Sequence, residues 1–145
     1  MALLEIHDLH TFFKTKKGIV KAVNGVSYSV EPGKTLGVVG ESGSGKSVSA
    51  MSILKLLDGN GYIDSGEIIF DGKNLADVSV KDMCKIRGNE ISMIFQEPMT
   101  SLNPVFRIGA QIDEVIALHD GEGKSKEDIK KRTVELLEMV GIANS

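Results

Sequence analysis

Gly40-Glu41-Ser42-Gly43-Ser44-Gly45-Lys46-Ser47 is the stretch that decides the fold, because it matches the phosphate-binding pattern G-x-x-x-x-G-K-[ST] at every fixed position. In this pattern successive backbone N–H groups surround the phosphates of a nucleotide. The glycines allow backbone angles and close approaches that a side chain would obstruct. Lys46 would place its charge beside the β- and γ-phosphates, and Ser47 would offer its hydroxyl to a magnesium ion bound there.

The residues on either side of this loop have the pattern that such a site requires. Residues 35–39 form a short, mostly apolar run, which predicts a buried strand that enters the loop. Residues 46–57 predict a helix, whose positive dipole end would face the phosphates. Its apolar residues, which we expect to be buried, are Val48, Met51, Leu54 and Leu57, joined by Ile53 and Leu56.

Composition and charge indicate a soluble globular chain. Of its 145 residues, 41% are hydrophobic and 26% are charged, and the formal net charge is −3. A mildly acidic chain is not expected to bind nucleic acid. The chain has no apolar run of the roughly 18 residues that span a bilayer and no signal peptide, so we expect a cytoplasmic location. Cys84 is the single cysteine, and neither it nor the histidines have the spacing of a metal site.

Strand signals precede and follow the loop. Residues 3–9 and 20–30 are rich in apolar and β-branched side chains, and the polar, basic stretch 14–18 between them predicts a hairpin. Residues 66–72 predict a strand that enters a tight turn, and residues 91–95 predict another buried strand. We therefore expect an antiparallel sheet before the loop and a parallel core around it.

Three further helices are predicted. Residues 79–82 resemble a capping box, so a short helix should run through residue 86. After the polar segment 96–104, in which two prolines disfavour a helix, the chain shows two amphipathic patterns. A capping box at residues 125–128 opens the second of them, and Gly141 ends it. Each of these two helices has one face that we expect to pack in a core. In the first helix the face consists of Ile108, Ile112, Val115, Ile116 and His119. In the second helix it consists of Ile129, Thr133, Leu136, Leu137 and Val140.

Together these features resemble the amino-terminal part of an ABC-transporter nucleotide-binding domain. The resemblance rests on the loop, on the Gly-Glu-Ile-x-Phe-Asp-Gly strand at residues 66–72, and on Met93-Ile94-Phe95-Gln96. Residues 21–27, 37–48 and 93–104 are similar to the dipeptide/oligopeptide and nickel importer ATPases in particular. The resemblance covers all 145 residues.

This resemblance implies an α/β fold, a P-loop NTPase core with an N-terminal antiparallel β subdomain and the start of an α-helical subdomain. Within one truncated domain, residues 1–34 would form the β region and 35–95 the P-loop core. Residues 96–106 would form the Q-loop, and residues 107–145 would begin the helical subdomain.

The resemblance also implies roles for individual residues, with ATP and Mg²⁺ as cofactors. Phe13 would stack on adenine, although Phe12 or an ordinary strand aromatic remain alternatives. Gln96 matches the glutamine that reaches magnesium and the attacking water, so Lys46 and Gln96 are the catalytic candidates and Ser47 and Gln96 the metal ligands. The expected nucleotide loop comprises Gly40, Glu41, Ser42, Gly43, Ser44, Gly45, Lys46, Ser47 and Val48.

The sequence departs from the family pattern in one large respect. The Leu-Ser-Gly-Gly-Gln-type signature, the acidic Walker B strand with its glutamate, and the switch histidine are absent from residues 1–145. We therefore expect an N-terminal fragment that binds nucleotide, hydrolyses little of it alone, and leaves apolar surface uncovered.

The function implied for the complete protein is that of an energy-coupling ATPase of a di- or oligopeptide importer, peripheral at the cytoplasmic face of the membrane. Its partners would be permease subunits, contacted by residues 97–107, and a second ATPase subunit, a paralogue, with an extracytoplasmic peptide-binding protein acting indirectly. Nickel import and a non-transport ABC ATPase role, as in DNA repair, remain open. A small-molecule kinase is disfavoured, because such a kinase needs a lid rich in arginine. This sequence has only Arg87, Arg107 and Arg132.

Overall fold

Two long antiparallel strands organise the first half of the chain in the computed structural model, which describes residues 2–97, 101–119 and 123–142. Contacts divide the chain into two units, residues 1–87 and residues 88–145. This division does not follow the expected boundaries at residues 34, 95 and 106, which stay a prediction. The first unit contains the phosphate loop, and the second contains Gln96.

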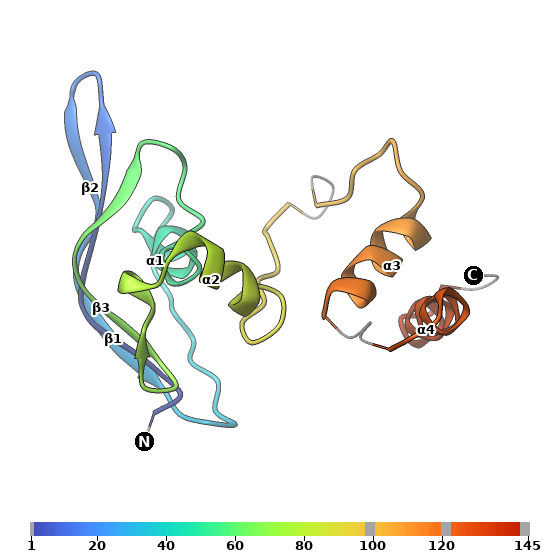
Figure 1. Ribbon diagram of the computed structural model, residues 1–145. Helices are drawn as coiled ribbons and strands as arrows, with labels where there is room; N and C mark the ends of the chain where they lie inside the picture. The colour runs from blue at the N-terminus through green and yellow to red at the C-terminus, as the bar shows by residue number, and fades with distance from the viewer. Residues whose placement is uncertain (1, 98–100, 120–122, 143–145) are drawn as a thin grey trace. The chain divides into compact units, whose positions relative to one another are not determined.

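The sheet of the first unit has four strands in the order β2-β1-β3-β4, and every pair is antiparallel (Figure 1). β1 spans Leu4–Thr15 and β2 spans Gly18–Val30, so the predicted hairpin is confirmed. β3 covers Gly61–Phe70 and β4 covers Lys73–Asn74. Between β3 and β4, Asp71 and Gly72 both have positive φ, 46° and 77°, as a tight type I′ hairpin turn requires.

Irregularities in three neighbouring strands meet at Asp8. The register of β1 shifts here against both β2 and β3, and Asp8 itself has a left-handed φ of 45°. Gly25 on β2 and Gly66 on β3 also have positive φ, 80° and 99°. A Cβ on Gly66 would collide with the Asp8 carbonyl oxygen, so only glycine allows β3 to approach β1 this closely.

One apolar core lies between the sheet and the short helices that follow it. Its helical members come from the 3₁₀-helix η1, Leu75–Asp77, and from α2, Val80–Ile86. The side chains that are fully or nearly fully buried are Ile6, Leu9, Val23, Leu54, Ile68, Leu75, Met83 and Ile86. Ser79 accepts a hydrogen bond from the Asp82 amide at 3.2 Å, which confirms the predicted start of α2.

The helix α1, Lys46–Ile53, ends four residues before the predicted end at residue 57. Lys55 adopts a left-handed φ of 50°, and the amides of Lys55 and Leu56 donate to the carbonyls of Ser52 and Met51. This is the Schellman arrangement, with lysine where glycine is usual. The apolar periodicity continued past the turn because Leu54 is buried beside the helix end, not because the helix continues.

Two predicted strands are absent from the described part of the chain. Residues 35–39 have no regular structure, and Val39 is 93% exposed. In residues 91–95 only Ile91 makes a bridge, and Ile94 is 96% exposed. A buried strand needs hydrogen-bonded neighbours on both sides, and among the described residues the bridge at Ile91 is the only such pairing in either run. The expected parallel core is therefore not formed, and the expected uncovered apolar surface is present.

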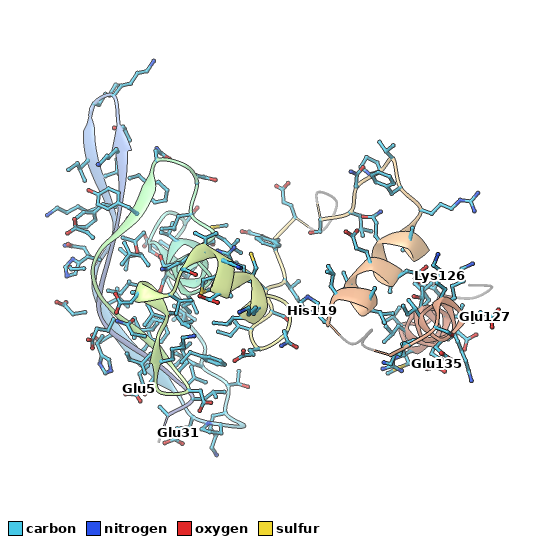
Figure 2. The ribbon with its side chains drawn as sticks, viewed as in Figure 1. Glu5, Glu31, His119, Lys126, Glu127 and Glu135 are labelled. Carbon is cyan, nitrogen blue, oxygen red and sulfur yellow. The ribbon has the colours of Figure 1, made fainter. Side chains whose placement is uncertain are left out.

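The second unit is built from α3, Ile108–His119, and α4, Lys126–Met139. They pack through a hydrogen bond from the Thr133 hydroxyl to Asp113, and Thr133 and Ile116 are buried. The other members of the predicted apolar faces are half-buried, as Ile112 and Leu136 are, or exposed, as Val115 is at 55%. Lys126, Glu127 and Glu135 project from the outside of α4 (Figure 2), as a solvated face does. The capping box at residues 125–128 and the end at Gly141, with φ 82°, are confirmed.

We expect Gly66→Ala to lower the free energy of unfolding by at least about 2 kcal/mol, because the new Cβ adds a collision with β1 to the cost of a positive φ. Gly72→Ala is the matched control. Gly72→Ala also places alanine at a positive φ, 77°, but no atom lies within 4 Å of the new Cβ. Its free energy of unfolding should therefore fall by only about 1 kcal/mol. Urea denaturation measures both, and equal losses would contradict the close packing of β3 on β1.

The start of α4 should weaken in acid. Hydrogen bonds from the Ser125 hydroxyl and amide lower the pKa of the Asp128 carboxyl below its ordinary value of 3.8. Because the folded-state pKa is depressed, the cap is fully effective above the ordinary value and is lost as pH falls through the folded value. Amide NMR shifts of residues 125–128 should report this loss as the pH falls below the ordinary carboxyl pKa of 3.8. In Asp128→Asn the same amides should show no such transition.

Candidate functional site

The phosphate loop runs from Gly40 directly into the first turn of α1. Gly45 caps the helix with a left-handed φ of 89°, and no side chain caps it. In the described part of the chain, the amides from Gly45 to Val48 have no hydrogen-bond acceptor. Four consecutive donors at the positive end of a helix form a site for an anion.

Lys46 braces this loop from within. Its ammonium group donates to the carbonyl oxygens of Gly40 and Glu41, both at 2.7 Å, and to the Ser44 hydroxyl at 3.3 Å. The charge is therefore held at the loop, beside the unpaired amides. When an anion enters, the Lys46 ammonium can donate to it in place of the neutral oxygens of the loop. Hydrogen bonds between two charged groups are stronger than those to a neutral acceptor.

The hollow at the loop has a volume of about 150 Å³. Ligand pockets for whole small molecules span roughly 300–1,000 Å³, so this hollow fits a phosphate group more than a complete nucleotide. Ser47 opens onto it with an exposed hydroxyl that has no partner among the described residues. The lining residues are Ala22, Gly43, Ser44, Gly45, Lys46, Ser47 and Val48.

Ala22, on β2, belongs to the site although the sequence did not indicate it. A Cβ on Gly45 would collide with the Ala22 carbonyl oxygen, so the loop is pressed against the backbone of β2. The glycine is required here by the protein's own backbone as well as by a ligand. No residue pattern could have revealed Ala22, because the contact is made by its main chain.

The face of α1 that packs on the sheet is polar, which corrects the predicted apolar stripe. Ser49 and Ser52 are the buried residues within the helix, whereas Val48 and Met51 are only half-buried. The Ser49 hydroxyl pairs with Tyr28 of β2 at 2.9 Å. Hydroxyl pairs replace apolar contact here, so a hydrophobic pattern could not identify the buried face.

The second hydroxyl pair joins α1 to β1. Ser52 donates to the Val48 carbonyl oxygen at 2.7 Å, so its oxygen accepts from the Thr11 hydroxyl at 2.8 Å. Both residues are completely buried. Each hydroxyl is thus satisfied, as buried polar groups require.

Two cations anchor the far end of α1. Arg87 donates to the carbonyl oxygens of Leu54 and Lys55 at 2.7 and 2.9 Å, which satisfies helix-end acceptors and opposes the negative end of the dipole. The Lys55 ammonium donates to the carbonyls of Ala76 and Val78. Burial lowers the pKa of Lys55, and Arg87 lowers it further, whereas Asp77 acts in the opposite direction.

Phe13 and Phe12 do not line the phosphate hollow. Phe12 is 7% exposed, with the Tyr62 ring edge-on at 6.2 Å and the Lys21 ammonium 5.4 Å from its centroid. Phe13 is half-buried and lies against Gly61. Of the two rings Phe13 has the more accessible surface, and its adenine role stays a prediction.

Gln96 lies in the second unit and is exposed. Residues 98–100 of the expected Q-loop fall outside the described residues. Beyond them, Gln111 of α3 clamps the chain: its amide accepts from the Asn103 amide at 2.9 Å and donates to the carbonyls of Asn103 and Phe106. Sequence reasoning missed Gln111, because its partners are main-chain groups.

Other chemistry is not indicated by the described residues. Residues 2–97, 101–119 and 123–142 contain no group of three or more His, Cys, Asp or Glu side chains that could hold a metal ion. Cys84 is exposed and unpaired, and His10 contacts Asp8 and Asn24 at 3.2 Å each. No helix within the same ranges has the length and apolar character needed to cross a membrane.

Residues 23–144 match the sequence profile of the family described as ABC transporter. The oligopeptide transport ATP-binding protein OppD of Bacillus subtilis is 55% identical over 141 residues, which are 97% of this chain and 39% of that protein. The dipeptide transport ATP-binding protein DppD of Lactococcus lactis is 50% identical over 143 residues, 99% of this chain and 41% of that protein. The chain spans about two fifths of the length of these relatives.

A solved structure supports the same grouping at the level of the fold. A dimeric ATP-binding cassette in a post-hydrolysis state, bound to ADP and Pi, aligns with a TM-score of 0.81 at 24% identity. The alignment covers 94% of this chain and 56% of that one. The chain therefore has the fold of part of an ATP-binding cassette, which confirms the predicted fold class.

We expect Ser52→Ala to lower the free energy of unfolding by about 1–3 kcal/mol, because it leaves the buried Thr11 hydroxyl without an acceptor. Thr11→Val should cost less, since Ser52 keeps its bond to Val48 and the replacement is nearly isosteric. Chemical denaturation of both variants measures the difference. A larger loss in Thr11→Val would contradict the assigned direction of this hydrogen bond.

Proposed function

The chain belongs to the ABC transporter family, and on that premise we propose that it carries the phosphate-binding part of the ATP-binding subunit of a peptide importer. In the complete protein, ATP hydrolysis would drive a permease that takes up di- or oligopeptides. The observation that carries this proposal is the loop of residues 40–48, with its unpaired amides and internal lysine. Peptide as cargo, and not nickel, is supported by the names of the relatives.

The residues present fit magnesium-bound ATP. Lys46 and the amides of residues 45–48 would hold the β- and γ-phosphates, and the free Ser47 hydroxyl would be a magnesium ligand. When bound, magnesium would neutralise charge on the phosphates. The chain itself would orient the phosphates through the amides of residues 45–48 and the Lys46 ammonium, which are held in place by the loop.

Phe13 and Gln96 complete the proposed site from outside the loop. Phe13, half-buried near the edge of the β1–β2 hairpin, would stack on adenine. Gln96 would reach the metal and the attacking water, with an exposed amide available for both. Phe13 does not line the hollow at the loop, and the roles proposed for both residues rest on the family resemblance.

The proposed permease contact lies after Gln96. Leu102, Val105 and Phe106 are 46%, 83% and 61% exposed, and Gln111 holds their backbone in place. Apolar side chains presented on a clamped loop suit the docking of a helix from a permease subunit at the cytoplasmic face of the membrane. A second ATPase subunit, a paralogue, and an extracytoplasmic peptide-binding protein would complete the transporter.

Calorimetric titration of the 145-residue polypeptide with magnesium and a non-hydrolysable ATP analogue tests the proposal. We expect saturable binding by the wild type and a loss of at least about tenfold in affinity for Lys46→Ala, because a charged hydrogen bond to phosphate is removed.

Lys130→Ala is the control, since it also removes a lysine but lies exposed on α4. Its affinity should equal that of the wild type. A wild type that is folded by circular dichroism yet does not bind the analogue would refute the proposed function. Equal binding by wild type and Lys46→Ala would refute the assigned site.

A further inference from the structure

Two contacts join the phosphate loop and the first turn of α1 to the sheet, and both are with β2. The first is the close approach of Gly45 to the Ala22 carbonyl oxygen. The second is the hydrogen bond between the hydroxyls of Tyr28 and Ser49, at 2.9 Å. Gly45 and Ser49 are themselves joined, because the Ser49 amide donates to the Gly45 carbonyl oxygen at 2.8 Å and closes the first turn of α1.

These two points constrain different motions of the helix. The contact at Gly45 fixes where the loop sits, but it is a contact of backbone atoms at one position and allows α1 to rotate about its axis. The Tyr28–Ser49 hydroxyl pair lies one turn further along and opposes that rotation in the turn next to the loop, whereas the Thr11–Ser52 pair opposes it nearly a turn beyond. The unpaired amides point along the helix axis beyond the first turn but lie off that axis, so a rotation of α1 shifts their positions relative to a bound anion.

From this arrangement we infer that Tyr28 is a positioning residue for the phosphates: through Ser49 it fixes the first turn of α1 against β2 and thereby positions the amides of residues 45–48. The inference rests on the proposed function, because it concerns the same nucleotide site. Tyr28 does not line the phosphate hollow; it lines an adjoining one of about 210 Å³, together with Val38, Val39 and Lys46.

The environment of the pair favours such a role. Ser49 is 6% exposed, so the hydrogen bond is largely shielded from water and is not easily replaced by solvent. Tyr28 lies near the end of β2, where it pairs with Ile6 of β1, which is almost completely buried. A rigid strand thus carries the hydroxyl, as precise placement of a binding group requires.

Thr11 and Ser52 provide an internal control. Their hydroxyl pair, at 2.8 Å, attaches the same helix to the sheet, but through β1 and nearly a turn further from the loop. Thr11→Val and Tyr28→Phe each remove one hydroxyl from the sheet side of α1. If the pairs only stabilise the fold, the two variants should affect nucleotide affinity alike.

The test is calorimetric titration of the 145-residue polypeptide with magnesium and a non-hydrolysable ATP analogue, at a temperature well below the unfolding temperature of every variant. We expect Tyr28→Phe to weaken binding about three- to tenfold, the equivalent of one neutral hydrogen bond, and Thr11→Val to change it less than about twofold. Ser49→Ala should match Tyr28→Phe, and the double variant should lose no more than either single one.

Each result distinguishes the positioning role from the proposed function. Wild-type binding that Lys46→Ala abolishes and Tyr28→Phe leaves unchanged would overturn the positioning role alone. Equal losses in Tyr28→Phe and Thr11→Val would also overturn it. Additive losses in Tyr28→Phe and Ser49→Ala would show that Tyr28 does not act through Ser49. Absence of binding by the folded wild type would overturn the proposed function and the positioning role together.

Discussion

The contact between Gly45 and the carbonyl oxygen of Ala22 is the constraint on which the rest of the site depends. A loop that presents four unpaired amides cannot hold its own shape by backbone hydrogen bonds, because those donors are reserved. Its shape must come from neighbours: a strand behind it and the Lys46 ammonium within it. Strand β2, remote from phosphate chemistry in sequence, is therefore part of the binding machinery.

The helix α1 that carries the loop has only eight residues, too few to be stable in isolation. Polar contacts hold it at both ends instead of an apolar face. On the sheet side, Tyr28 and Thr11 form hydrogen bonds with its two buried serines. At its carboxyl end, Arg87 donates to the Leu54 carbonyl oxygen, and the Lys55 ammonium donates to the Ala76 carbonyl oxygen. Directional bonds of this kind specify one orientation, whereas an apolar stripe tolerates small rotations.

Local signals in the sequence were sufficient for part of this structure. The β1–β2 hairpin, the start of α2 at Ser79 and the capping box at residues 125–128 follow from neighbouring residues alone, and the structure confirms them. Residues 35–39 and 91–95 have strand composition but no described partner, and pairing is not a local property. The roles of Ala22, Tyr28 and Gln111 depend on main-chain or hydroxyl contacts between distant segments, which periodicity does not encode.

The aligned irregularities at Asp8, Gly25 and Gly66 couple the lengths of three strands. A slip of one residue turns every side chain of a strand to the opposite face, so a deletion in β1 would have to be matched in β2 and β3. Grafting this sheet from one relative into another should therefore succeed only when all three irregularities are transplanted together. The turn at Lys16 and Lys17, which lies between the exposed ends of β1 and β2, is where inserted residues would be tolerated.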